Sequence, residues 1–324
     1  MLAAASRRGA DGPRIAVIDA GKSTVRAAVF AGDHVLARHR EEEGFLHPGA
    51  PEAQQAVLAK VREVLSRLEH GPYDTVVLAT TGVRSHGEAE HALQAALAEH
   101  AGCDVLVVND VIAAYLGALG PRPGVLVQAG TGSLVLGAVE GCPLVHLDGW
   151  GHLAGDRGSG FALGRAGLQA ACSALDGAGP STTLTAELTG ADPERFIGEL
   201  YASSTPTKDV AALARSVLRT AAVGDRVAVD VVSAIVSELV DMALAAGRRL
   251  GDPQLRDLPV AFVGGLFFDT LFADTVAGHL RARCPEAKML HGAGDALEGG
   301  RLLAATPHDP ITHLLTSAFR SEDP

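Results

Sequence analysis

Two short loops rich in glycine and hydroxyl side chains follow apolar segments in the two halves of the chain. The first spans residues 19–24 and the second spans residues 130–133. Glycines allow the backbone to approach an anion closely, and successive backbone N–H groups in a tight turn can cup a phosphate. A carboxylate at a strand end, such as Asp19, can hold Mg²⁺ through water. The two loops therefore predict sites for phosphate groups and for a divalent cation.

The first loop contains Gly-Lys-Ser-Thr at residues 21–24, which is part of the P-loop pattern. A complete P-loop needs a glycine five positions before Gly21, where Ala16 stands, and a helix directly afterwards. Residues 24–30 instead alternate between the two faces of a strand. We therefore predict a tight hairpin. A plain hairpin with a solvated Asp19 is the alternative.

Asp110 lies where a predicted strand runs into a predicted helix, next to Asn109. Aspartate at a helix start is often only a cap. A carboxylate there can also accept the proton of an attacking hydroxyl group during phosphoryl transfer. Both interpretations stay open at this point.

Residues 148–165 carry six glycines and the only tryptophan of the chain. Such a composition builds a core poorly, so we predict a loop that follows a ligand and enters a helix near Ser159. A purely structural loop is the alternative. Gly264 and Gly265, after an apolar run, could let adenine or ribose lie against the backbone, or could simply turn the chain.

The elements that must position these residues form a repeating pattern. In the first half we expect strands over 14–40, 75–80 and 105–108 and helices over 51–69, 87–100 and 110–118. After the Gly/Pro-rich residues 120–124 we expect strands over 125–128, 134–139 and 144–147. A strand, a glycine turn and two further strands thus occur twice. We predict an internal repeat, with one domain at 13–119, a second at 120–324, and a disordered segment at 1–12.

The remainder is predicted to be largely helical. Helices are expected over 161–176, 207–222, 226–250, 295–305 and, shorter, 310–319, and a strand over 260–263 precedes a helix that runs to 282. Residues 226–250 are apolar on most faces, which favours burial between domains or subunits. Gly292, Gly294, Gly299 and Gly300 could flank a nucleotide.

Composition excludes several classes of protein. The net charge of −11 argues against nucleic acid or an anionic membrane as the main partner. The four cysteines are dispersed and no HExxH motif occurs, so we assign no site for a transition metal. No segment is apolar enough for a signal peptide or a membrane span. We expect a cytoplasmic protein.

The order of these motifs resembles the BadF/BadG/BcrA/BcrD ATPase group, within the actin, hexokinase and Hsp70 superfamily, and above all its N-acetylglucosamine kinase branch. The resemblance covers about residues 14–305, and its most specific part is the Gly-Trp-Gly stretch at 149–165. It implies an α/β fold of two ribonuclease-H-like (actin-like ATPase) domains with an interdomain cleft. It also implies ATP and Mg²⁺ as cofactors, transfer of the γ-phosphate to an amino sugar, and a homodimer.

The resemblance assigns roles to individual residues. Asp110 would be the general base, and Asp19 would position Mg²⁺. The nucleotide would be held by Gly21, Lys22, Ser23, Thr24, Gly130, Thr131, Gly132, Ser133, Gly264 and Gly265. The substrate site would include His47, Asn109, Trp150, Gly151, His152 and Asp156.

Ala20 and Lys22 stand where relatives carry glycines, and Arg157 stands where they carry glutamate. The loop around His47 lacks the asparagine usual in the sugar kinases. N-acetylglucosamine or glucosamine is the expected acceptor, and a related sugar or cyclitol such as N-acetylmuramic acid is the alternative. A non-catalytic regulatory protein that binds ATP or sugar is a further alternative. The dispersed cysteines argue against an iron–sulfur activator of a radical dehydratase.

Overall fold

The computed structural model describes residues 12–21, 24–42, 51–83, 87–290 and 294–319. The chain divides into two compact units. The first comprises residues 1–123, 138–144 and 292–324, and the second comprises residues 124–137 and 145–291. The boundary at residue 123 lies close to the predicted one, but residues 292–324 group with the first unit and not with the second domain as we expected. Most of the segment predicted to be disordered lies outside the described residues.

The first unit contains a five-stranded sheet whose strands are β1 (Arg14–Ala20), β2 (Val25–Ala31), β3 (His34–Glu41), β4 (Thr75–Thr80) and β5 (Asp104–Asn109). Their spatial order is β3-β2-β1-β4-β5. The first three strands pair antiparallel, whereas β4 and β5 run parallel to β1. The predicted meander and both later strands are confirmed.

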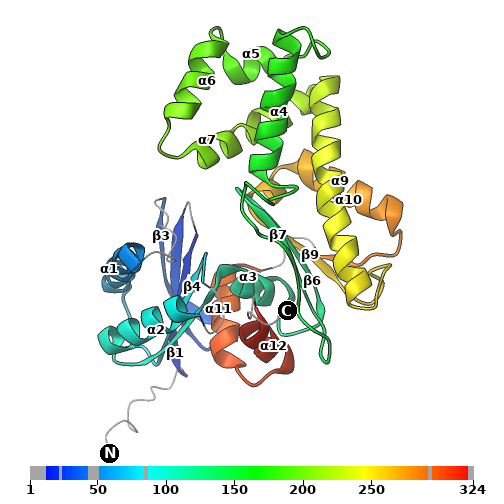
Figure 1. The fold of residues 1–324 in the computed structure, drawn as a ribbon. Coiled ribbons are helices and arrows are strands. Elements are labelled where there is room, and N and C mark those ends of the chain that lie inside the picture. Colours follow the sequence, from blue (N-terminus) through cyan, green and yellow to red (C-terminus); the bar gives the residue numbers. More distant parts are fainter. Residues whose placement is uncertain (1–11, 22–23, 43–50, 84–86, 291–293, 320–324) are drawn as a thin grey trace, which may run out of the picture. The chain divides into compact units, whose positions relative to one another are not determined.

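Helices cover both faces of this sheet. On one face, α1 (Pro51–Arg67) and α2 (Glu88–Ala101) cover the sheet (Figure 1). They share with β1 a buried apolar cluster that includes Ile18, Val61 and Leu97. The other face carries α3 (Asp110–Leu119) and α11 (Ala296–Ala305), while α12 (Pro310–Ala318) packs on α3. All five helices lie within two residues of their predicted bounds.

The close contact of α11 with α3 explains why residues 292–324 return to the first unit. A Cβ added at Gly299 would lie 1.7 Å from the carbonyl oxygen of Ala113, and one at Gly300 would lie 2.3 Å from Cγ1 of Val17. Only glycine permits helix backbones to come this near. These two glycines therefore serve the packing of α11, and the possible role of the cluster in flanking a nucleotide stays a prediction; Gly292 lies outside the described residues.

The second unit repeats the topology of the first. Its strands are β6 (Gly124–Ala129), β7 (Ser133–Ala138), β8 (Val145–Asp148), β9 (Val260–Val263) and β10 (Met289–Leu290), in the spatial order β8-β7-β6-β9-β10. Taken in chain order within each unit, both sheets read third, second, first, fourth, fifth. The predicted internal repeat is confirmed. The two-residue strand β10 was not predicted.

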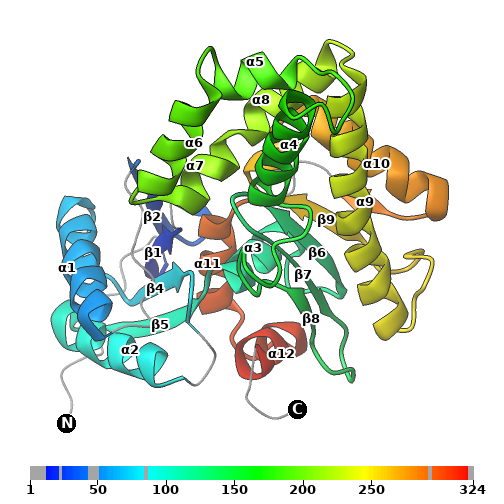
Figure 2. The same ribbon diagram turned by 45° about the horizontal axis from the view of Figure 1, so that its top comes forward.

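Helices make up the rest of the second unit (Figure 2). They are α4 (Gly160–Leu175), α5 (Leu184–Thr189), α6 (Pro193–Ala202), α7 (Pro206–Ala212), α8 (Ala214–Ala222), α9 (Arg226–Arg249) and α10 (Thr270–Arg283), with a 3₁₀-helix, η1 (Gly265–Phe268). The single helix predicted over 207–222 is two, because the amide of Leu213 donates to Val210, three residues back. The apolar α9 packs against α4, α8, α10, β6 and β8, so its burial lies within this unit.

Among the described residues, no helix combines the length and the apolar character that crossing a bilayer requires.

The contact between α3 and α11 generates a stability prediction. Gly299→Ala should destabilise the protein by about 1–3 kcal/mol, because the new methyl group overlaps a backbone carbonyl. Gly278→Ala, in α10, is the matched control, since a Cβ there meets nothing within 4 Å. The control should gain about 0.5–1 kcal/mol from helix propensity. Urea unfolding of both variants measures the difference, and equal midpoints would contradict the packing argument.

Candidate functional site

The carboxyl ends of three parallel strands meet at one edge of the first sheet. Ala20 of β1 is in register with Thr80 of β4, which is in register with Asn109 of β5. Asp19 and Asp110 therefore end at the same edge, two strands apart. With roughly 4.8 Å between neighbouring strands, the two positions are about 10 Å apart across the sheet. This spacing leaves room for a reacting group and a metal ion between the two carboxylates.

Asn109, and not Asp110, caps the helix that follows β5. Its Oδ1 accepts a hydrogen bond of 3.1 Å from the amide of Val111, and its Nδ2 donates one of 2.9 Å to the carbonyl of Val83. Asp110 takes the first position of α3, where the helix dipole favours negative charge. Capping therefore does not account for Asp110. The polar groups of Asn109 are used to hold the strand-to-helix turn.

Asp19 is paired with Arg26, which stands directly opposite it on β2. Both Nε, at 3.0 Å, and Nη2 of Arg26 donate to Oδ2 of Asp19, whose side chain is only 13% exposed. Arg26 also lies 3.8 Å from Asp295, the residue that caps α11. Burial raises the pKa of Asp19, and the neighbouring guanidinium partly opposes this shift. Our sequence analysis missed Arg26, although it is the one charged residue of β2.

The surroundings of Asp19 fit a magnesium ion held with a nucleotide. Among the described side chains, only Arg26 donates to Asp19, and both of its bonds end on Oδ2, so Oδ1 accepts no hydrogen bond from these side chains. The described residues contain no cluster of three or more His, Cys, Asp or Glu that could cage a metal. Magnesium in kinases uses one or two carboxylates together with phosphates and water, which is the chemistry that a single carboxylate suits.

The first loop is a hairpin, as predicted. The amide of Gly21 donates to the carbonyl of Thr24 at 3.0 Å, and β2 follows directly. No helix begins here, so the P-loop interpretation is excluded. Lys22 and Ser23, as well as His47 of the predicted substrate loop, lie outside the described residues.

The second loop is bound to the start of α4. The amide of Gly160 donates to the carbonyl of Gly130 at 2.7 Å, and that of Phe161 donates to Thr131 at 3.2 Å. The loop itself is closed by a bond of 2.8 Å from the Gly130 amide to the Gly132 carbonyl. The positive end of the α4 dipole therefore lies against this loop, which favours binding of an anion such as phosphate.

A buried carboxylate network holds the same loop from the other side. Asp148 is buried and accepts hydrogen bonds from the amides of Asp156, at 2.8 Å, and Arg157, at 3.0 Å, and also from Nε of Arg157. Asp156 in turn accepts from the amide of Ser133 at 3.2 Å. Asp156 thus supports the loop at residues 130–133. Asp148 was missed in the sequence, where nothing separates it from other loop aspartates.

The glycines of residues 148–165 have two different explanations. A Cβ at Gly155 would meet the Asp148 carboxylate at 2.0 Å, and one at Gly158 would meet Leu239 at 2.5 Å, so these glycines serve internal packing. Gly151 has φ +80° and nothing within 4 Å of an added Cβ. Its neighbour Trp150 is 70% exposed. The part of the loop that is open to a ligand is therefore its beginning.

His152 is held against the second unit's helices. Its ring meets Phe161 edge to face, with 5.0 Å between ring centroids, and its Nδ1 lies 3.5 Å from the hydroxyl of Thr207. These contacts fix the imidazole beside the start of α4.

The glycine pair after β9 borders the second loop. Gly264 has φ +109°, and a Cβ there would lie 2.2 Å from the carbonyl oxygen of Ala129. A Cβ at Gly130 would lie 3.8 Å from the amide nitrogen of Gly265. The structure therefore brings together three predicted elements, namely residues 130–133, 148–165 and the glycine pair, within the second unit.

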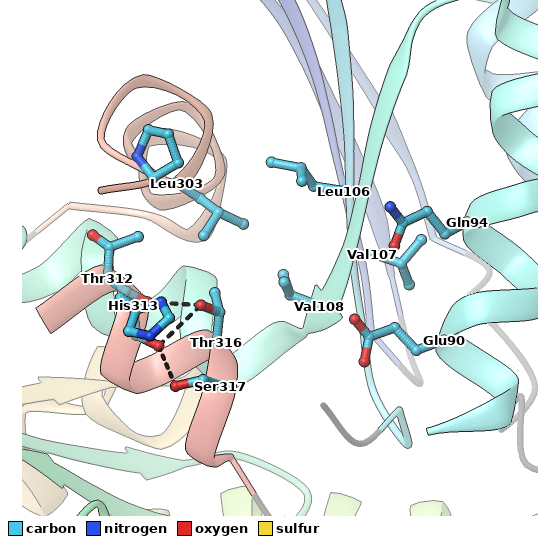
Figure 3. Close-up of a pocket in the computed structure, with 11 residues that line it drawn as sticks. Glu90, Gln94, Leu106, Val107, Val108, Leu303, Thr312, His313, Thr316 and Ser317 are labelled. Carbon is cyan, nitrogen blue, oxygen red and sulfur yellow. Dashed lines mark hydrogen bonds between the residues drawn. The ribbon is translucent and has the colours of Figure 1, made fainter. Parts of the chain in front are cut away.

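One cavity of about 220 Å³ lies in the first unit, along the open edge of β5 (Figure 3). Glu90 and Gln94 of α2 line one side, and His313, Thr316 and Ser317 of α12 line the other. The hydroxyl groups of Thr316 and Ser317 are bonded to carbonyls of their own helix. The cavity is therefore a gap beside a helix that covers a sheet edge, and neither Asp19 nor Asp110 lines it.

Comparison with known proteins agrees with this geometry. The chain is 27% identical to an N-acetylmuramic acid/N-acetylglucosamine kinase from Clostridium acetobutylicum over 210 residues, which are 63% of this chain and 68% of that protein. It is 28% identical to an N-acetyl-D-glucosamine kinase from Dictyostelium discoideum over 203 residues, 60% of this chain and 64% of that protein.

A solved structure shows the same fold over nearly the whole chain. It is a protein from Chromobacterium violaceum proposed to be an N-acetylglucosamine kinase, 27% identical, with a TM-score of 0.67, covering 90% of this chain and 99% of its own. The profile of one family matches residues 18–289, which include both loops, Asp110 and the glycine pair. The chain belongs to the BadF/BadG/BcrA/BcrD ATPase family.

Proposed function

We propose that this chain is an ATP-dependent sugar kinase that phosphorylates a hydroxyl group of N-acetylglucosamine or glucosamine. The observation that carries the proposal is the register of β1, β4 and β5, which brings Asp19 and Asp110 to one edge of the first sheet. The second unit adds a glycine loop backed by the positive end of α4. Membership of a family of ATPases supports ATP as the phosphate donor.

In this mechanism Asp110 accepts the proton of the sugar hydroxyl as its oxygen attacks the γ-phosphorus, and the bond to the leaving ADP breaks. Backbone N–H groups of the two loops stabilise charge on the transferred group. Bound Mg²⁺ would neutralise phosphate charge, and Asp19 would hold it through water. Thr131 and Gly132 would contact the phosphates, whereas Gly130 and Ser133, whose amides donate to Gly132 and Asp156, would hold the loop in shape.

The amino sugar as acceptor is supported by the names of the two curated relatives. The open start of the Gly-Trp-Gly loop, at Trp150 and Gly151, and the fixed imidazole of His152 are the groups that we assign to the sugar. Asp156 accepts a hydrogen bond from the second loop, so we propose that it supports that loop and does not contact the sugar. We propose that Asn109 holds the turn that presents Asp110. N-acetylmuramic acid, which one relative's name includes, is the second candidate acceptor.

The proposed function also predicts the cellular compartment and the partners of the protein. A kinase that uses ATP and a small sugar would work in the cytoplasm, and the net charge of −11 supports a protein without nucleic acid or membrane partners. A homodimer, which such kinases often form, stays a prediction.

The direct test is ADP release from Mg-ATP with separate acceptors: N-acetylglucosamine, glucosamine, N-acetylmuramic acid, glucose and an amino-cyclitol. We expect turnover with at least one of the first two. Turnover only with N-acetylmuramic acid would replace the substrate and keep the class of reaction. ATP binding without turnover on any acceptor would favour the non-catalytic regulatory protein instead.

Asp110→Asn tests the proton acceptor. The variant should lose about 10²–10⁴-fold in kcat, which is the usual contribution of a general base. Its affinity for ATP should stay close to that of the parent, because the amide keeps the shape of the side chain. Asp309→Asn, which changes the cap of α12 in the same unit, is the matched control and should keep its rate. A kcat of Asp110→Asn within a few-fold of the parent would exclude this role.

Asp19→Asn tests the metal carboxylate. The Mg²⁺ concentration needed for half-maximal binding of a fluorescent ATP analogue should rise about 10- to 100-fold, as for other groups that act on a metal from its outer sphere. Asp33→Asn, at an exposed turn of the same sheet, is the control. If both variants required the same Mg²⁺ concentration as the parent, Asp19 would not hold the ion.

A further inference from the structure

Two neighbouring phenylalanines after the glycine pair have opposite environments. Phe267 packs inward, with its ring centroid 5.2 Å from that of Phe262 and 5.4 Å from that of Phe272. Phe268 is 91% exposed. Single exposed apolar residues are common and need no explanation, so exposure alone does not indicate a role for Phe268. The position of Phe268 relative to Gly264 and Gly265 does indicate one.

Gly265 and Phe268 are the first and last residues of η1. In a 3₁₀-helix, residues i and i+3 lie one above the other on the same face. The ring of Phe268 therefore stands in line with the bare backbone of Gly265. A strip of surface results that is flat over the glycine and ends at an exposed aromatic ring.

Gly265 has no structural need to be glycine. A Cβ at this position would meet nothing within 4 Å, and its backbone does not adopt a positive φ. Gly264 differs, because it combines φ +109° with a contact of 2.2 Å to Ala129. The missing side chain at Gly265 thus leaves space above the strip without serving the packing of the unit.

The strip begins at the second phosphate loop. A Cβ at Gly130 would lie 3.8 Å from the amide nitrogen of Gly265, and the loop faces the positive end of α4. Phosphate, sugar and base follow one another in a nucleotide, as the loop, Gly265 and Phe268 follow one another here.

We propose that Phe268 is a stacking platform for the adenine base, with the ribose over Gly265 and the phosphates at residues 130–133. The proposal rests on ATP being the phosphate donor, as proposed above. Aromatic side chains bind a base through its π-face, whatever the pattern of hydrogen-bonding groups at its edge. Phe268 therefore contributes affinity for a nucleotide and little selection between adenine and guanine.

The test is equilibrium binding of Mg-ATP and of inorganic tripolyphosphate to the full chain by calorimetry. Phe268→Ala should weaken ATP binding roughly 5- to 100-fold, the range for losing one base–aromatic stack, and should leave tripolyphosphate binding unchanged. Phe268→Trp should restore ATP affinity, whereas Phe268→Leu, apolar but not planar, should not. Tyr201→Ala is the matched control, because Tyr201 is 89% exposed in the same unit and should not affect either ligand.

The outcomes separate this inference from the proposed function. Equal ATP affinity of Phe268→Ala and the parent, with kinase activity intact, would overturn the stacking role and leave the kinase standing. A change in oligomeric state without a change in ATP affinity would also overturn it, since Phe268 would then belong to an interface. A parent protein that binds tripolyphosphate but not ATP would overturn both.

Discussion

The parallel pairing of β1 with β4 and of β4 with β5 is the constraint on which the candidate chemistry depends. Parallel strands end at the same edge, so Asp19 and Asp110, which are 91 positions apart in the chain, reach the same edge of the sheet. The faces of the sheet are closed by α1 and α2 on one side and by α3 and α11 on the other. The carboxyl edge of the parallel strands is the general place for binding sites in sheets of this kind.

The second unit has the same sheet topology, but its aspartates near the strand ends have a different role. At the end of β8 and in the loop that follows it, the carboxylates of Asp148 and Asp156 are bonded to backbone amides. Asp148 accepts from the amides of Asp156 and Arg157, and Asp156 accepts from Ser133. Buried carboxylates of this kind stabilise a loop because each acceptor meets a backbone donor that would otherwise be unpaired. Residues 130–133 are thereby held in one conformation, which would lower the entropy cost of binding the phosphates that we propose for this loop.

Local patterns predicted most of the elements, whereas relations between distant segments were not predictable from one sequence. Alternating apolar residues and glycine turns identified nine of the ten strands and the repeat, and only the two-residue β10 was missed. The pairing of Arg26 with Asp19 requires the register of β1 and β2. The return of residues 292–324 to the first unit depends on a glycine contact with a helix about 180 residues earlier. Gly299 and Gly265 each belong to a pair of adjacent glycines, and the sequence does not distinguish them. In the structure, the backbone of α3 occupies the space beside Gly299, whereas the space beside Gly265 is open.

The carboxyl edges of the two sheets differ in their local charge, and this difference predicts that they bind different groups. At the first edge, Arg26 pairs with Asp19 and lies 3.8 Å from Asp295, and Arg38 lies 4.0 Å from Asp295. Together with Asp110, which ends at the same edge, these five side chains carry a formal charge of −1. Such an edge suits a hydrated cation and a neutral sugar. At the second edge the nearest field is the positive end of a 16-residue helix, which suits phosphate. A chain of net charge −11 repels a nucleotide at long range, so in the proposed function local features such as this dipole have to supply the attraction for phosphate.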